Sequence, residues 1–381
     1  MNKKIQIQAF IYKIQFFTLL ASAAILSFQY ELFMLDRGVH IALALLVFGI
    51  GQTSGLLTSI VIRKYIDIIN QSKLFQISLC VRTLTMLIMF FTQNHILFIS
   101  LFLIYNINSS AGFLFESNVA KWSSENSIRF STLRMFGSTG FAVAGFLATF
   151  LYNLTGSLNF ILLFLATLNG LNAFFSFKIP FKKSEKIQSE ELIIISAKTR
   201  ILIILCATIS TLPGAFGIIL NNTYRYYFGL NVNDALFFAS LSVLLGSFVS
   251  ELVGFKTVDI LVKKFNAKKT ILIGIVISLI RWIATFFAPN HIFLTATYLT
   301  HGFTFAYVYL GILAYIKQKE TNKVVMEFFI FSNIISLVLV QLTNLLLEFF
   351  TNSSVAIALS IINFVSLILF VFVYIVDGKK Q

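Results

Sequence analysis

Residues 132–154 read TLRMFGSTGFAVAGFLATFLYNL, and this stretch decides the class of fold. It is long enough to cross a bilayer, because a spanning helix needs about 20 mostly apolar residues. Its one charged side chain is Arg134. An arginine at membrane depth costs at least ~2.5–3.5 kcal/mol on insertion scales, so it normally faces a protein interior or a pathway. The stretch therefore predicts a membrane-spanning helix with a polar face.

The rest of the chain repeats this pattern. Hydrophobic residues make up 58% of the 381 and charged residues 12%, and the mean hydropathy is +0.88, far from the values of ordinary globular domains. We expect an all-α membrane protein with twelve transmembrane helices. The expected spans are residues 9–30, 40–62, 74–92, 96–118, 132–154, 157–178, 201–224, 233–255, 270–288, 292–316, 325–348 and 354–376. Lys13 interrupts the first span and eleven others follow, so we interpret it as an uncleaved helix rather than a secretory signal.

The net charge of +14 is distributed as a topology signal. If both termini face the cytoplasm, 24 of the 29 Lys and Arg residues fall at the cytoplasmic side, one (Arg37) falls outside and four lie within spans. The positive-inside rule predicts this asymmetry for an even number of spans. We therefore expect a multi-pass protein of the cytoplasmic membrane with both termini cytoplasmic. The basic excess indicates the anionic inner leaflet of the lipid bilayer as partner and not nucleic acid.

The chain reads as two related halves. Residues 179–199 form the longest stretch between spans and separate a six-helix bundle at 1–178 from another at 200–381. In each half a basic loop precedes the third helix, which carries one arginine (Arg82 or Arg281) and ends Phe-Phe. Two six-helix pseudo-repeats are the plan of the major facilitator fold. The sequence contains no soluble catalytic domain, phosphate-binding loop or metal-ligand spacing. We expect no enzyme activity, no catalytic residues, no metal and no cofactor.

The motif around Arg134 carries a more specific resemblance. The run from Leu133 to Phe141, LRMFGSTGF, resembles the fifth helix of the lactose permeases, where an Arg-Met-Phe-Gly run holds a substrate-binding arginine. Glu116 lies 18 residues upstream of Arg134, the separation that those permeases show between their sugar-binding carboxylate and arginine. Phe141 stands where they place a ring-stacking tryptophan. The resemblance implies that Glu116, Arg134 and Phe141 bind substrate.

The carboxyl half carries a second group of matches. Arg281 and His301 resemble, with a separation of 20 residues, the arginine and histidine of the ninth and tenth helices of the same permeases. Glu251 lies where the wider phenylpropionate-permease-like branch carries a glutamate. The resemblance implies that these three residues couple transport to a proton. The permeases have an acid at the position of Thr304, so we expect any proton path here to be either simplified or relocated to Glu251.

The resemblance identifies the chain as a member of the major facilitator superfamily. It implies a monomeric secondary transporter that moves a small-molecule substrate (a sugar, a nucleoside or an aromatic acid) by alternating access, with proton symport. Two alternatives stay open, an efflux carrier for amphiphilic compounds and a non-transporting membrane sensor or assembly protein. A structural ion pair between Glu116 and Arg134 is the alternative to a substrate site. Separately, Gly140, Ala144 and Ala148 form a line of small residues that predicts close helix packing.

Overall fold

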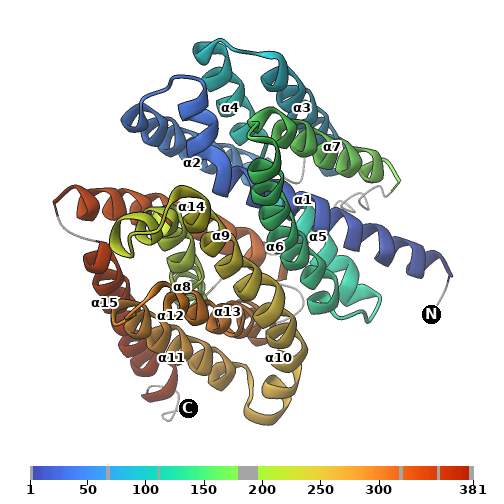
Figure 1. Ribbon diagram of the computed structural model, residues 1–381. Coiled ribbons are helices and arrows are strands. Elements are labelled where there is room, and N and C mark those ends of the chain that lie inside the picture. Colours follow the sequence, from blue (N-terminus) through green and yellow to red (C-terminus); the bar gives the residue numbers. More distant parts are fainter. Residues whose placement is uncertain are drawn as a thin grey trace. The chain divides into compact units, whose positions relative to one another are not determined.

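The computed structural model describes residues 3–65, 69–109, 112–178, 196–316, 321–349 and 352–376. This part of the chain is nearly all helical and contains no strand (Figure 1). It divides into two compact units, residues 1–193 (unit 1) and 194–381 (unit 2). Because residues 179–195 lie outside the described part, the domain boundaries expected from the sequence, with a linker at 179–199, stay a prediction.

Unit 1 consists of apolar helices joined by short turns. They are α1 (Lys3–Asp36), α2 (Ile41–Lys64), α3 (Gln71–Phe91), α4 (His95–Ser109), α5 (Gly112–Glu125), α6 (Phe130–Thr155) and α7 (Leu158–Ser176). The fourth expected span corresponds to α4 followed by α5. The other five expected spans of this half each fall on one helix.

Unit 2 repeats this plan with more irregular helices. Its elements are α8 (Ala197–Asn222), the π-helix η1 (Thr223–Tyr227), α9 (Val232–Val243), the π-helix η2 (Leu244–Ser250), α10 (Glu251–Phe265), α11 (Ala267–Phe286), α12 (His291–Thr297), the 3₁₀-helix η3 (Tyr298–Thr300), α13 (His301–Tyr315), α14 (Thr321–Phe349), α15 (Asn352–Phe370) and the π-helix η5 (Val371–Val376). The six expected spans of this half all fall on these elements.

Length and composition support a membrane-spanning arrangement. Within the described residues, nine helices are long and apolar enough to cross a bilayer. The three other expected spans are also helical: α2 and α14 contain shorter apolar stretches, at Leu46–Ile62 and Glu327–Thr343, and η3 separates α12 from α13. The all-α membrane fold expected from the sequence is therefore confirmed.

The internal repeat is visible in the helix packing. In unit 1, α1 packs against α6 and α7, α3 against α4 and α7, and α2 against α4. In unit 2, the helices that correspond to these in the order of the spans make the same pairs. These are α8 with α14 and α15, α11 with α13 and α15, and α10 with α13. The two units are thus six-span pseudo-repeats of each other.

Asparagine side chains begin several of the helices. The side chains of Asn70, Asn231, Asn266 and Asn290 each accept a hydrogen bond from a backbone N–H three residues further on. Such caps satisfy amide groups that a helix start leaves unpaired. They fix where α3, α9, α11 and α12 begin.

The small-residue seam of α6 packs against α1, which confirms the prediction for this helix. Gly140, Ala144 and Ala148 are all buried. A Cβ atom at Gly140 would lie only 2.2 Å from the carbonyl oxygen of Phe17, so the two backbones approach as closely as glycine allows. This close approach positions Arg134, one and a half turns earlier on α6.

Candidate functional site

Unit 1 contains an ion pair inside its helix bundle. Glu116 lies in the second turn of α5, and Arg134 lies in the second turn of α6. The Arg134 Nε donates to Glu116 Oε1 at 2.9 Å, and both side chains are about nine-tenths buried. Arg134 Nη1 also donates to the Ser138 hydroxyl, one turn further along α6, at 3.4 Å. The ion pair between the two charged residues, the alternative to a substrate site in the sequence analysis, is therefore present, and a role in substrate binding stays a prediction.

Packing from α1 holds the arginine in place. The Arg134 Cζ lies 5.9 Å from the centroid of the Phe16 ring, within range of a cation–π contact. A Cβ atom at Gly137 would lie 2.4 Å from a Leu20 methyl and 3.0 Å from Arg134 Nη1. A larger residue here would therefore require the Leu20 side chain to shift.

Phe141, the third residue expected to bind substrate, is half-buried on α6. It follows Arg134 by seven residues, two helical turns, and so lies on the same side of the helix. Its role in substrate binding stays a prediction. Glu116 and Arg134 are already bonded to each other. A solute that binds them would therefore have to break this ion pair and replace it with its own hydrogen bonds to the two side chains.

In unit 2 the three residues expected to couple a proton lie in contact with one another. Glu251 begins α10, Arg281 lies on α11 and His301 begins α13. The His301 Nε2 lies 3.4 Å from Glu251 Oε1, and the His301 Nδ1 lies 3.0 Å from Arg281 Nη1. Glu251 and Arg281 are buried. The imidazole therefore connects a carboxylate to a guanidinium, and we call these three residues the Glu251–His301–Arg281 chain.

The geometry assigns the tautomer of the imidazole. A guanidinium nitrogen only donates, so Nδ1 must accept from Arg281. The remaining ring proton then sits on Nε2, from which it is donated to the Glu251 carboxylate. We assign neutral His301 with its proton on Nε2, since a second ring proton would point at the Arg281 donor.

Two aromatic rings surround the guanidinium of Arg281. Its Cζ lies 4.5 Å from the ring centroid of Tyr298 and 4.9 Å from that of Trp282. All three side chains are buried. Cation–π contacts of this kind hold a positive charge away from water at a reduced cost.

Irregular helix geometry places the chain of three residues. Glu251 follows the π-helix η2 directly, and His301 follows the 3₁₀-helix η3 directly. The backbones of α10 and α13 meet at this point: a Cβ atom at Gly302 would lie 2.0 Å from the Glu251 nitrogen. The Gly302 N–H donates to the Ser250 hydroxyl at 2.7 Å. Interruptions of α-helical geometry often accompany functional residues.

Sequence reasoning missed several aromatic partners. Arg82 on α3 is buried, donates to the hydroxyl of Tyr105 on α4 and lies over its ring. Arg281 and Tyr298 form the corresponding pair of unit 2, from the third and fourth spans of that half. The repeated arginine was visible in the sequence. Its tyrosine partner was not, because the spacing from arginine to tyrosine differs between the halves.

A second missed group consists of three buried side-chain hydroxyls. The hydroxyl of Tyr224 lies 2.7 Å from that of Ser242 and 2.6 Å from that of Thr295, and all three residues are buried. These hydrogen bonds join η1, α9 and α12. Among the residues that the structure describes, no three His, Cys, Asp or Glu side chains gather closely enough to hold a metal ion.

Comparison with solved structures shows a transporter fold. The nucleoside transporter NupG has a TM-score of 0.67 at 13% identity, over 96% of this chain and 99% of that one. A bacterial homologue of the iron transporter ferroportin, in an outward-facing state, has a TM-score of 0.72 at 15% identity, over 98% of this chain and 99% of that one. No curated protein sequence matches significantly.

The sequence itself matches one family. The match is to the MFS_1-like family and covers residues 9–327, most of the chain. It agrees with the transporter fold of the structural neighbours and with the expectation of a major facilitator protein. The chain belongs to the MFS_1-like family and is a multi-pass membrane transporter of the major facilitator type.

Proposed function

We propose that this transporter moves a small polar solute across the cytoplasmic membrane by alternating access, coupled to a proton in symport. The observation that carries this proposal is the Glu251–His301–Arg281 chain of unit 2. A carboxylate, an imidazole and a guanidinium inside a membrane bundle are costly to keep, and such groups mark ion and proton pathways.

The geometry supports Glu251 as the proton-binding group. As a carboxylate it accepts the Nε2 proton of His301, and His301 in turn accepts from Arg281. A proton on Glu251 would remove the negative charge that orders this chain and would free His301 and Arg281 to change partners. Coupling needs such a group, whose proton affinity differs between two conformations of the carrier.

For the solute we propose Glu116, Arg134 and Phe141 as binding residues. The guanidinium can donate to two acceptors and the carboxylate can accept from hydroxyl groups, a combination that suits a polyol or a nucleoside. One structural neighbour is a nucleoside transporter, which supports including nucleosides among the candidates. The closed ion pair at 2.9 Å supports a structural role as the alternative.

The proposal also includes the orientation of the protein in the membrane and its oligomeric state. The excess of Lys and Arg at one side supports a protein of the cytoplasmic membrane with both termini cytoplasmic. Carriers of this plan work as monomers, and we propose the same here. The coupling proton is the only cofactor the mechanism requires.

The test uses reconstituted vesicles without a preset gradient. A panel of sugars, nucleosides and aromatic acids is added outside, and the internal pH is followed. We expect one solute class to carry protons inward, and Glu251→Gln to abolish that movement. Glu327→Gln is the matched control, since Glu327 is also a buried carboxylate of unit 2 but contacts Arg200. Silence across the panel, with amphiphilic drugs extruded from energised vesicles, would replace import by efflux.

A further inference from the structure

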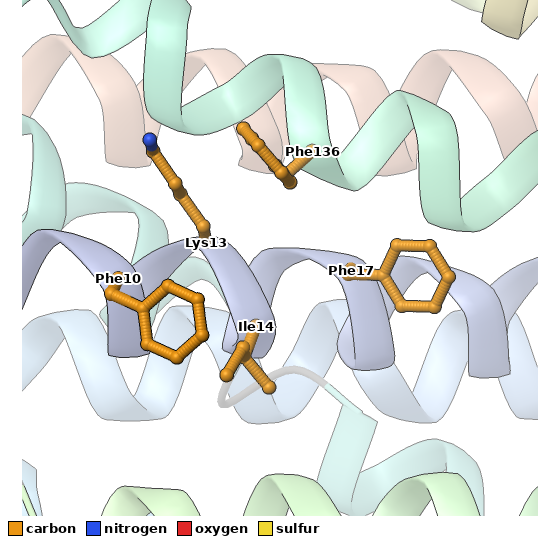
Figure 2. Close-up of a pocket in the computed structure, with 5 residues that line it drawn as sticks. All are labelled: Phe10, Lys13, Ile14, Phe17 and Phe136. Atoms are coloured by element: carbon orange, nitrogen blue, oxygen red, sulfur yellow. The ribbon is translucent and has the colours of Figure 1, made fainter.

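Unit 1 has a groove on α1 and α6 that the residues described above do not use. Its volume is about 430 Å³, and it is lined by Phe10, Lys13, Ile14, Phe17 and Phe136 (Figure 2). Four of the five lining side chains are apolar, and three are phenyl rings. Lys13 is the one charged group, and Figure 2 shows its side chain extending from α1 toward the helix that carries Phe136.

The lysine is placed where a charge is costly. It lies one helical turn inside the first expected span, and about 15 Å along α1 from Lys3 at 1.5 Å per residue. Its side chain is half-buried, and the Nζ atom lies 5.0 Å from the Phe136 ring centroid. Among the residues that the structure describes, no carboxylate lies within 4.0 Å of it. Within this described part of the chain, the ammonium therefore has an aromatic contact but no carboxylate at salt-bridge distance.

The groove and the Glu116–Arg134 pair share helix α6, since the groove lies on α1 and α6 and the pair joins α5 to α6. Phe136 follows Arg134 by two residues and so points to a different side of α6. On α1, Phe16 contacts Arg134 whereas Phe17 lines the groove. The groove is thus a separate feature on α6 beside the candidate solute site, and it differs from that site in having a positive charge that no carboxylate of the described residues pairs with.

We propose that this groove is a binding subsite for an organic anion with a flat apolar part, whose carboxylate or phosphate group pairs with Lys13. This inference rests on the proposed transport function and narrows its substrate class. The phenyl rings would contact the apolar part by stacking, and the ammonium would supply a charge-assisted hydrogen bond in a site of low polarity. Ordinary snorkelling of Lys13 toward the membrane surface is the opposing explanation.

The test compares two probes of equal shape, 2-naphthoate and 2-naphthamide, by isothermal titration calorimetry with the purified full chain in detergent. We expect naphthoate to bind about tenfold or more tightly than naphthamide, the scale of a charged hydrogen bond. Lys13→Met should weaken naphthoate by about the same factor and leave naphthamide unchanged, and Lys13→Arg should retain most of the affinity for naphthoate.

A matched control exists in the same unit. Lys178 also lies over a phenyl ring, 5.4 Å from the centroid of Phe174, but both side chains are exposed. Lys178→Met should bind both probes as the wild type does. Equal binding of the two probes, absence of naphthoate binding, or undiminished naphthoate binding by Lys13→Met would each overturn the proposal.

Two further arms separate related outcomes. In the first, native mass spectrometry compares the phosphatidylglycerol that remains bound to the wild type and to Lys13→Met. If the lipid is lost only from Lys13→Met and naphthoate does not bind, Lys13 binds a lipid headgroup and the solute subsite is refuted. If naphthoate binds through Lys13 but no solute of the panel crosses vesicles, transport fails while the subsite stands. If naphthoate crosses vesicles at the same rate with Lys13→Met, transport stands and the subsite fails.

Discussion

At the scale of single residues, the structure contains two charged arrangements that differ in whether the carboxylate contacts the guanidinium directly. Glu116 and Arg134 form a direct pair within 2.9 Å. Glu251 and Arg281 instead share His301 between them. Both arrangements are neutral as units, but the second places an imidazole, an additional group that can bind a proton, between its carboxylate and its guanidinium. This difference supports binding or structure for the first arrangement and proton coupling for the second.

The first prediction separates a structural pair from a substrate site. Removing one partner of a buried ion pair leaves the other charge unpaired in an apolar interior. Glu116→Leu and Arg134→Met should therefore each lower the free energy of unfolding by about 3–5 kcal/mol. The double variant should recover most of that loss. Thermal unfolding in detergent measures stability, and vesicle uptake measures function.

Vesicle uptake by the double variant distinguishes a structural pair from a substrate site. A substrate site predicts that uptake stays lost although the protein is again stable. A purely structural pair predicts that uptake returns together with stability.

A second prediction concerns the tautomer of His301. A glutamine amide offers a donor and an acceptor about as far apart as the two ring nitrogens, so His301→Gln can serve Glu251 and Arg281 together. His301→Leu can serve neither. We expect proton-coupled uptake to fall about tenfold or more in His301→Leu, because the loss of even one charged hydrogen bond has this effect and both are lost. Uptake should fall less in His301→Gln. Equal loss in both variants would show that the hydrogen-bond pattern assigned here is not the one used.

At the scale of elements, glycine contacts determine where charged residues meet. Gly302 lets α13 approach the backbone of Glu251, and Gly140 lets α6 approach that of Phe17. The first contact brings His301 next to Glu251, and the second places Arg134 beside α1. Small residues at such crossings let membrane helices pack closely.

A third prediction tests this contact. A methyl group at Gly302 would overlap the Glu251 nitrogen, so Gly302→Ala should lower stability by about 1–3 kcal/mol and impair proton coupling. Gly217→Ala is the control, because its Cβ would meet no atom within 4 Å and alanine favours the helix. Thermal unfolding should show a loss for the first variant and none for the second. A stable, fully coupled Gly302→Ala protein would rule out the close approach.

The elements also show what sequence could and could not provide. The apolar runs predicted helices at all twelve expected spans, and nine of the described helices are long and apolar enough to cross a bilayer. The motif resemblance singled out Glu116, Arg134, Arg281 and His301, which the structure brings together as two pairs. The π-helices at Thr223–Tyr227 and Leu244–Ser250 were not predicted, since they depend on packing rather than local composition. The stacking of Arg82 on Tyr105 was missed for the same reason, because sequence does not show which aromatic ring a neighbouring helix presents.

At the scale of the whole molecule, the distribution of charge predicts orientation. Lys264, exposed at the end of α10, should face the cytoplasm, and Gln93, exposed between α3 and α4, should face outward. Single cysteines introduced as Lys264→Cys and Gln93→Cys, in a chain whose Cys80 and Cys206 are replaced by alanine, can be labelled with a membrane-impermeant maleimide. Intact cells should label only the Gln93→Cys protein. Labelling of the Lys264→Cys protein alone would invert the topology.

The central claim, a transporter coupled to a proton through Glu251, is tested most directly by comparing net flux with exchange. The experiment uses reconstituted protein and a solute that carries protons in the panel. Glutamine resembles protonated glutamate, so Glu251→Gln should exchange labelled for unlabelled solute across the membrane yet fail to accumulate solute when a pH gradient is imposed. Glu327→Gln should do both. Accumulation by Glu251→Gln at the wild-type level would contradict the account, because the proton would then travel by another route.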